Sequence, residues 1–152
     1  MQTPYTDVAA DHEHPHAAMH MTFAAHPTAV SCARTLARYA AGQCWRQEYL
    51  LDDLEVLVSE LVTNAVKAAA ANTRPGLARV EVRMLLLPTS IVTQVWDPTP
   101  DLPVMQPLRP DAESGRGLHI VAALASRWGS FHSGRGGKVV WCEIATSTAP
   151  ST

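Results

Sequence analysis

The sequence predicts a two-layer α/β sandwich in which a mixed, mostly antiparallel sheet is covered on one face by helices. Two features of the chain favour this fold class. One long segment has the apolar spacing of three and four residues that an amphipathic helix shows, and two shorter segments, one rich in alanine and one apolar, follow helix-start signals. Short runs of strand-forming residues lie before and after these segments. With 152 residues, of which 47% are hydrophobic and 17% charged, we expect one globular domain.

The N-terminal part of the chain predicts a tail, an edge strand and a helix. Residues 1–17 combine prolines, acidic residues and three histidines without an apolar period, so we expect a disordered tail. Residues 18–24 are short and alternate in character, as in an edge strand. An alanine-rich helix is expected from Thr28 to about Ala41, with Gly42 ending it.

The central helix is predicted over residues 48–71, the longest periodic segment of the chain. Its apolar side chains recur at intervals of three and four, at Leu50, Leu54, Leu57, Val58, Leu61, Val62, Ala65 and Val66. A turn at residues 72–76 follows it. Residues 77–87 and 90–96 are then expected to pair as a β-hairpin.

The last part of the chain predicts a loop, a short helix and two strands. Five prolines between residues 97 and 110 exclude a helix or an inner strand there, so an irregular loop is expected. A short apolar helix is predicted over residues 118–126. The remaining expected elements are strands at 128–133 and 138–144, a turn between them at 134–137, and a frayed tail at 146–152.

Composition excludes several functional classes. Twelve basic and fourteen acidic residues leave a formal charge of −2, so bulk charge favours neither nucleic acid nor an anionic membrane as a partner. The three cysteines are far apart and form no CxxC pair, which argues against a disulfide framework or structural zinc. No apolar run approaches the roughly 20 residues of a membrane span, and no signal-peptide pattern is present. We therefore expect a cytoplasmic protein.

Three polar elements interrupt the apolar pattern. Glu60 and Asn64 lie four residues apart on the central helix, where the amide oxygen can bind a hydrated Mg²⁺ and the carboxylate can orient or deprotonate a nucleophile. Asp97, at the end of the second hairpin strand, can accept a hydrogen bond from an exocyclic amine. A Gly-Arg-Gly sequence before the short helix can expose backbone N–H groups to phosphate oxygens. Taken singly, the Glu60/Asn64 pair is more typical of a solvated helix face, and Asp97 alone indicates little. A lone Gly-x-Gly is equally often a turn and a helix cap.

The order and spacing of these elements resemble the GHKL, or Bergerat-fold, ATP-binding family. The motifs that carry the resemblance are ELVTNAV at residues 60–66, VWDPTPDLP at 95–103, ESGRGLHIVAALASRWG at 113–129 and GGKVVWCEI at 136–144. Within the family, the first three of these motifs are most similar to bacterial anti-sigma-factor serine kinases and to their single-domain relatives in actinobacteria. The resemblance covers about residues 27–144 and implies an ATP-binding domain at residues 18–145.

By position, the resemblance implies roles in binding ATP and Mg²⁺. Glu60 would be the catalytic carboxylate, Asn64 the Mg²⁺ ligand, and Asp97 the acceptor for the adenine amino group. The phosphates would lie against the second glycine box, which consists of Gly115, Arg116, Gly117 and Leu118. Lys67, which follows Asn64 on a similar helix face, would either meet a phosphate or be solvated. The loop at about 101–114 would be the ATP lid.

Three positions depart from the family pattern. The family usually has x-Gly after the aspartate of its first glycine box, whereas Pro-Thr-Pro follows Asp97. Glu113 stands where some kinase relatives have a basic residue, and Val139 stands where a threonine is common on the final strand. The first two departures favour weaker contacts to the nucleotide and its γ-phosphate.

The resemblance implies an ATP-dependent regulator that sequesters a sigma factor and phosphorylates a serine on an antagonist protein of the STAS type. It also allows a homodimer, without direct contact to nucleic acid or membrane. The alternative is a module of the same fold that binds nucleotide, or only a partner protein, without turnover. The ATPase half of a two-component histidine kinase is a weaker alternative, because residues 1–26 are too short to supply a phosphoacceptor hairpin.

Overall fold

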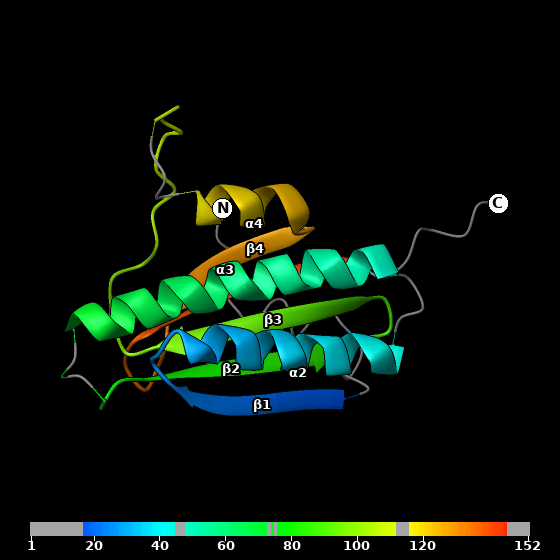
Figure 1. Ribbon diagram of the computed structural model, residues 1–152, viewed down its shortest axis with the longest axis horizontal. Coiled ribbons are helices and arrows are strands. Elements are labelled where there is room, and N and C mark those ends of the chain that lie inside the picture. The colour runs from blue at the N-terminus through cyan, green and yellow to red at the C-terminus, as the bar shows by residue number, and fades with distance from the viewer. Residues whose placement is uncertain (1–16, 45–47, 73, 75, 112–115, 146–152) are drawn as a thin grey trace.

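The computed structural model describes residues 17–44, 48–72, 74, 76–111 and 116–145 (Figure 1). Its elements are β1 (Ala17–Ala24), α2 (Thr28–Cys44), α3 (Glu48–Asn72), β2 (Arg79–Leu86), β3 (Ser90–Asp97), α4 (Gly117–Leu124), β4 (Arg127–His132) and β5 (Lys138–Ala145). Every helix and strand expected from the sequence is therefore present. Residues 1–16 of the tail expected at 1–17, the tail expected at 146–152, and the site positions Glu113 and Gly115 lie outside the described residues.

The five strands form one sheet in the order β1-β2-β3-β5-β4. All four pairings are antiparallel, so the sheet holds no parallel pair among its described strands. The helices lie together over one face of the sheet, with α3 between α2 and α4 (Figure 1). The predicted two-layer α/β sandwich is confirmed.

Several boundaries differ from those expected. Ala17, expected in the tail, already pairs with Leu86 at the start of β1. Gly42 does not end α2, which continues to Cys44; the space around its α-carbon is open, so no close approach requires a glycine there. The last helix, α4, begins at Gly117 and ends at Leu124, two residues before the expected end.

The core lies between the helical layer and the sheet, and α3 supplies its largest side chains. The largest fully buried side chains of this helix are those of Leu54, Leu57, Val58, Leu61 and Val62. Opposite them, β2 contributes Val80, Val82 and Met84, which alternate along the strand as a half-buried sheet requires. Because α3 is anchored along its apolar face, the side chains at its edges have defined positions.

Small residues bring α2 close to the rest of the core. Ala33, Ala37 and Ala40 of this helix are completely buried, at the spacing of one helix face.

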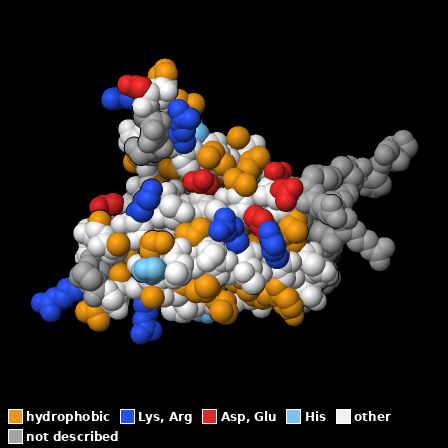
Figure 2. All heavy atoms as spheres, in the orientation of Figure 1, with side chains coloured by type: hydrophobic (Ala, Val, Ile, Leu, Met, Phe, Trp, Pro, Cys, Tyr) orange, Lys and Arg blue, Asp and Glu red, His pale blue; other side chains and the backbone are white. Residues whose placement is uncertain are grey.

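The polar surface of the helical layer is mixed: in Figure 2 basic and acidic side chains are interspersed on the visible face, and neither sign forms a continuous patch. Among the described helices, none has the length and apolar character needed to cross a membrane.

The turn between β4 and β5 is held against the end of β3. Trp96 donates a hydrogen bond from Nε1 to the carbonyl oxygen of Gly136, 2.9 Å away, and the guanidinium of Arg135 lies 4.4 Å from the centre of the Trp96 ring. Gly137 has φ = +75°, and a β-carbon there would lie only 2.1 Å from the carbonyl oxygen of Asp97. This turn therefore requires glycine at 137 for both conformation and space.

Glu81 of β2 binds Arg135 of this turn on the face of the sheet that the helices do not cover (Figure 1). Arg135 donates to both of its carboxylate oxygens, in one case over 2.9 Å, and His20 of β1 lies 3.2 Å from Oε2. The hydrogen bonds from Arg135 hold the pKa of Glu81 below its ordinary value, and the contact with His20 acts in the same direction.

We predict that Gly137→Ala lowers the free energy of unfolding by about 2 kcal/mol or more, since a β-carbon would be strained at positive φ and would overlap the backbone of β3. Gly134→Ala is the matched control, because nothing lies near its β-carbon position, and it should change stability by less than about 0.5 kcal/mol. Urea unfolding of both variants checks the difference. Equal stabilities would contradict the close approach at residue 137.

The Glu81–Arg135 pair should stabilise the fold in a pH-dependent way. Because the pKa of Glu81 is lower in the folded protein, its contribution is complete above the unfolded pKa near 4.5 and is lost as pH falls through the folded value. A double-mutant cycle with Glu81→Gln and Arg135→Gln should give a coupling energy of about 0.5–1 kcal/mol at pH 7. The same cycle at pH 3 should give a smaller value. A coupling energy independent of pH would contradict the assignment.

Candidate functional site

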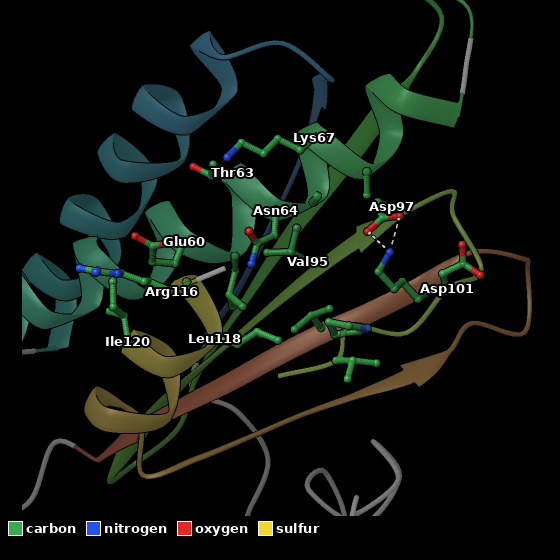
Figure 3. A pocket seen from close by; sticks show the side chains of 18 of the residues that line it. Glu60, Thr63, Asn64, Lys67, Val95, Asp97, Asp101, Arg116, Leu118 and Ile120 are labelled. Carbon is green, nitrogen blue, oxygen red and sulfur yellow. Dashed lines mark hydrogen bonds and ion pairs between the residues drawn. The ribbon is translucent and has the colours of Figure 1, made fainter. Parts of the chain in front are cut away.

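A cavity of about 550 Å³ opens beside α3, next to the end of β3, the start of β5 and the start of α4 (Figure 3). Its volume is in the range of small-molecule sites. Every described residue that the sequence analysis placed in the site lines it, namely Glu60, Asn64, Lys67, Asp97, Arg116, Gly117 and Leu118. The structure therefore brings together three segments that are far apart in the chain.

The polar edge of α3 forms one wall of the cavity. Glu60 and Asn64 are partly buried and face the start of α4, whereas Lys67 is exposed at the rim (Figure 3). Their neighbours Leu61 and Ala65 are buried in the core, which fixes the rotation of the helix. The expected same-face arrangement of Glu60 and Asn64 thus occurs at the border between core and solvent.

The second glycine box packs directly against this polar edge. A β-carbon on Gly117 would lie 2.7 Å from Oε2 of Glu60 and 3.3 Å from Nδ2 of Asn64. The absence of a side chain at Gly117 is therefore what lets α4 begin beside these two groups. Gly115, the other glycine of the box, is outside the described residues.

The N-terminus of α4 offers unpaired hydrogen-bond donors to the cavity. Arg116 is the N-cap, has αR geometry and makes no side-chain capping bond, and the first turn contains no acidic residue. The first N–H groups of a helix have no partner within the helix, and the helix dipole favours an anion at this end. Together with the exposed guanidinium of Arg116, this end of the cavity is suited to phosphate oxygens.

The opposite end of the cavity contains a buried cluster that sequence reasoning did not assemble. Asp97, Thr99 and Lys138 are only 1%, 3% and 6% exposed. Lys138 Nζ lies 3.0 Å from Oδ2 and 3.1 Å from Oδ1 of Asp97, and 2.5 Å from Oγ1 of Thr99. The Thr99 amide donates to Oδ1 of Asp97 over 2.9 Å, and the Thr99 hydroxyl contacts the same oxygen.

Lys138 could have been found from one signal in the sequence. It is a lysine at the start of a strand that is otherwise apolar, directly after the glycines of the last turn. Its partner depends on the β3–β5 register, in which Asp97 lies opposite Lys138. Thr99 occupies the position at which the resemblance implies a glycine, and its backbone N–H and hydroxyl bind the carboxylate of Asp97.

Apolar side chains separate the two polar ends. The residues concerned are Leu61, Ala65, Val95, Leu118, Ile120 and Val140. Most of them belong to α3, β3 and β5, so the wall is part of the folded core. A cavity with a hydrogen-bond acceptor at one end, apolar walls in the middle and anion-binding donors at the other end is complementary to a nucleotide, which has a flat base and a charged phosphate chain.

The loop after β3, for which the resemblance implies a lid, borders the cavity. Asp101, Pro103, Val104 and Gln106 line it, while residues 112–114 are outside the described part of the chain. The carbonyl oxygen of Gln106 is hydrogen-bonded to Nε2 of His119 on α4, which connects the loop to this helix.

The ligands available for Mg²⁺ are few. Within the described residues, no three His, Cys, Asp or Glu side chains come together as a metal site. Mg²⁺ keeps several waters and commonly takes one or two protein oxygens plus substrate phosphates. Asn64 and the adjacent Glu60 line the cavity and could supply these one or two protein oxygens, while the phosphates of a nucleotide would supply the other ligands.

Known proteins share the sequence pattern and the fold of this chain. A family model described as histidine kinase-like ATPase domain matches residues 23–144. Among solved structures, the chain is similar to the crystal structure of the RsbU and RsbW domains of Rv1364c from Mycobacterium tuberculosis, with a TM-score of 0.62 and 21% identity. The match covers 89% of this chain and 34% of that one, so this chain spans about a third of that protein, and the likeness is one of fold. No curated protein matches the sequence.

The buried Asp97–Lys138 pair generates a prediction about stability. Lys138→Met leaves a buried carboxylate without its counter-ion and should lower the free energy of unfolding by about 3 kcal/mol at pH 7. Adding Asp97→Asn removes the unpaired charge and should restore part of that loss. Urea unfolding of the wild type, both single variants and the double variant checks this. Strictly additive effects of the two changes would show that the side chains do not interact.

Proposed function

Because the chain belongs to the histidine kinase-like ATPase domain family, we propose that its cavity binds ATP and that the protein is an ATP-dependent regulator. The observation that carries the proposal is the polarity of the cavity: a buried carboxylate at one end, an apolar middle and the N-terminus of α4 at the other. Each part suits one part of the nucleotide.

Asp97 would receive the adenine amino group. Its carboxylate is buried at the end of β3, and a carboxylate can accept from an amine but cannot donate to a ring nitrogen when ionised. Val95 and Val140 lie on adjacent strands beside it and would contact a face of the base. Burial makes the hydrogen bond from the amine strong and selective, since water cannot replace it easily.

The triphosphate would extend toward α4. Backbone N–H groups at Gly117 and Leu118 and the guanidinium of Arg116 supply donors, and Lys67 at the rim supplies a second cation. Asn64 would hold Mg²⁺ through its amide oxygen, and the ion would neutralise charge on the phosphates. The carboxylate of Glu60 lies next to Asn64 at the start of α4.

For catalysis we propose that Glu60 acts as the general base in phosphoryl transfer to a protein serine. The serine oxygen would form a bond to the γ-phosphorus while the bond from that phosphorus to the bridging oxygen breaks, and ADP leaves with the electron pair. The serine proton passes to Glu60. Phosphoryl transfer depends mainly on positioning and charge neutralisation, which these residues supply.

The partners we propose are a sigma factor, which the protein would sequester, and a STAS-type antagonist that carries the serine. The similarity of the three motifs to anti-sigma-factor serine kinases supports this assignment. The proline-rich loop beside the cavity has an exposed Val104 and Leu108, and it lies where a partner could respond to bound nucleotide.

A second candidate is a regulatory module that binds nucleotide without turnover. The buried Asp97 already accepts hydrogen bonds from Lys138 and Thr99, and the residue two positions after it is Thr99 where a glycine is usual in the family. Both features reduce the gain from binding a base. The two candidates therefore differ in turnover and share the site.

The test of nucleotide binding is calorimetric titration of ATP with and without Mg²⁺. Asp97→Asn retains the shape of the side chain but makes it a weaker acceptor for the hydrogen bond from the adenine amine. It should raise the Kd for ATP at least about tenfold. Asn64→Ala should remove most of the Mg²⁺ dependence. Lys67→Ala, at the exposed rim, removes one cation near the triphosphate and should raise the Kd by only about threefold. Arg79→Ala, an exposed residue of β2 that does not line the cavity, is the control and should leave the Kd unchanged. Folded wild-type protein that does not bind millimolar ATP would exclude the proposal.

Glu60→Gln separates the kinase from the binding module. It should leave the Kd for ATP within about threefold of wild type, and lower phosphoryl transfer by about 100-fold or more. Transfer of labelled phosphate from ATP to purified STAS-domain proteins of the same organism is the measurement. If wild type binds ATP but phosphorylates none of them, the module is the better description.

A further inference from the structure

Lys138 stands at the end of the cavity where the base would bind, which makes its remaining hydrogen-bonding capacity important. The residue is 6% exposed, lines the cavity and lies opposite Asp97 in the β3–β5 ladder. An ammonium group at this depth must be fully paired or must face a ligand. The bonds already made by Asp97 and Lys138 determine which base edge can be accepted.

The two oxygens of Asp97 differ in the bonds they accept. Oδ1 is bonded by the Thr99 amide, the Thr99 hydroxyl and Lys138 Nζ, which exceeds the two lone pairs of one oxygen. Oδ2 accepts from Lys138 at 3.0 Å and has no other partner among the described residues. The carboxylate therefore has room for one further donor, at Oδ2.

Lys138 has three N–H donors, and its partners use two of them. Thr99 Oγ1 takes one at 2.5 Å. The two oxygens of Asp97 lie at nearly equal distances, 3.0 and 3.1 Å, so one N–H can be shared between them as a three-centre bond. One N–H is then left for a ligand in the cavity.

We propose that Lys138 reads the base directly, by donating this N–H to the N1 ring nitrogen of adenine while Oδ2 of Asp97 accepts from the neighbouring N6 amine. This inference rests on the proposed binding of ATP and names a residue that determines which base is selected. Together the two side chains present one acceptor beside one donor, which is complementary to the Watson–Crick edge of adenine.

The same arrangement disfavours guanine. In the pose proposed for adenine, guanine would place its O6 acceptor against Oδ2 of Asp97 and its N1–H donor against the ammonium group of Lys138, so both pairs would be mismatched. A pose in which Asp97 accepts from both N1–H and the N2 amine would need two unoccupied acceptors, and Asp97 offers one, because Oδ1 is occupied by Thr99 and Lys138. Thr99 is thus a positioning residue: it donates to Oδ1 of Asp97 and accepts from Lys138.

The experiment compares ATP with two analogues on the wild-type protein, by calorimetry or by displacement of a fluorescent ATP analogue. In 1-deaza-ATP the N1 acceptor is replaced by C–H and the 6-amino group is retained. In 7-deaza-ATP the change is on the other side of the ring, so this analogue is the matched control. We expect 1-deaza-ATP to bind about 10- to 100-fold more weakly than ATP, and 7-deaza-ATP to bind within about threefold. GTP should bind at least about tenfold more weakly than ATP.

Lys138→Met provides the second measurement, at a temperature where the variant is folded. In this variant ATP and 1-deaza-ATP should bind equally, because the donor to N1 is gone. A merely structural role for Lys138 would weaken both ligands in parallel and preserve their ratio. If the variant does not fold, the wild-type comparison still decides the question.

The outcomes separate this inference from the function on which it rests. If wild type binds ATP and 1-deaza-ATP equally well, Lys138 does not read N1, and ATP binding stands. If 7-deaza-ATP is the analogue that loses affinity, the contact is to the other edge of the base and the assignment to N1 is overturned. If ATP itself does not bind, both proposals fail.

Discussion

The ion pair between Asp97 and Lys138 is the constraint on which the base end of the cavity depends. A buried carboxylate and a buried ammonium each cost several kcal/mol to remove from water, and their separation of 3.0 Å offsets that cost only in one geometry. The β3–β5 register supplies the geometry by placing the two residues opposite each other. The turn before β5 also fixes this geometry. Gly137 lets its backbone approach that of Asp97, and Trp96 donates a hydrogen bond to the carbonyl oxygen of Gly136. The acceptor proposed for adenine is therefore positioned by the sheet, while the loop contributes Thr99.

At the phosphate end, positions are determined by the packing of α3. The helix is buried along Leu54, Leu57 and Leu61, and this burial orients Glu60 and Asn64 toward α4. The short helix α4 then contributes its N-terminus, and Gly117 allows it to begin in contact with those two side chains. Rigid elements thus hold the groups that would act on the phosphates, whereas the proline-rich loop borders the cavity from the side that faces solvent.

Sequence reasoning predicted the features that depend on local patterns. The period of α3, the β2–β3 hairpin and the glycine-flanked start of α4 can all be read within windows of a few residues, and the spacing of Glu60 and Asn64 follows from the helix alone. It did not predict the pairing of Asp97 with Lys138, because the two residues are 41 positions apart and meet only through strand order. It was wrong about Gly42, since a glycine tolerated inside a helix gives the same local signal as one that ends it.

Strand order also has a consequence for biosynthesis. The last strand along the described chain, β5, lies inside the sheet between β3 and β4, although β4 precedes it. While a ribosome is still making β5, β3 has an open edge, β4 has no neighbour to pair with, and Asp97 has no counter-ion. The cavity can form only after the final strand has emerged and inserted. A nascent or C-terminally truncated chain would therefore contain most of the motif residues and still lack a complete site.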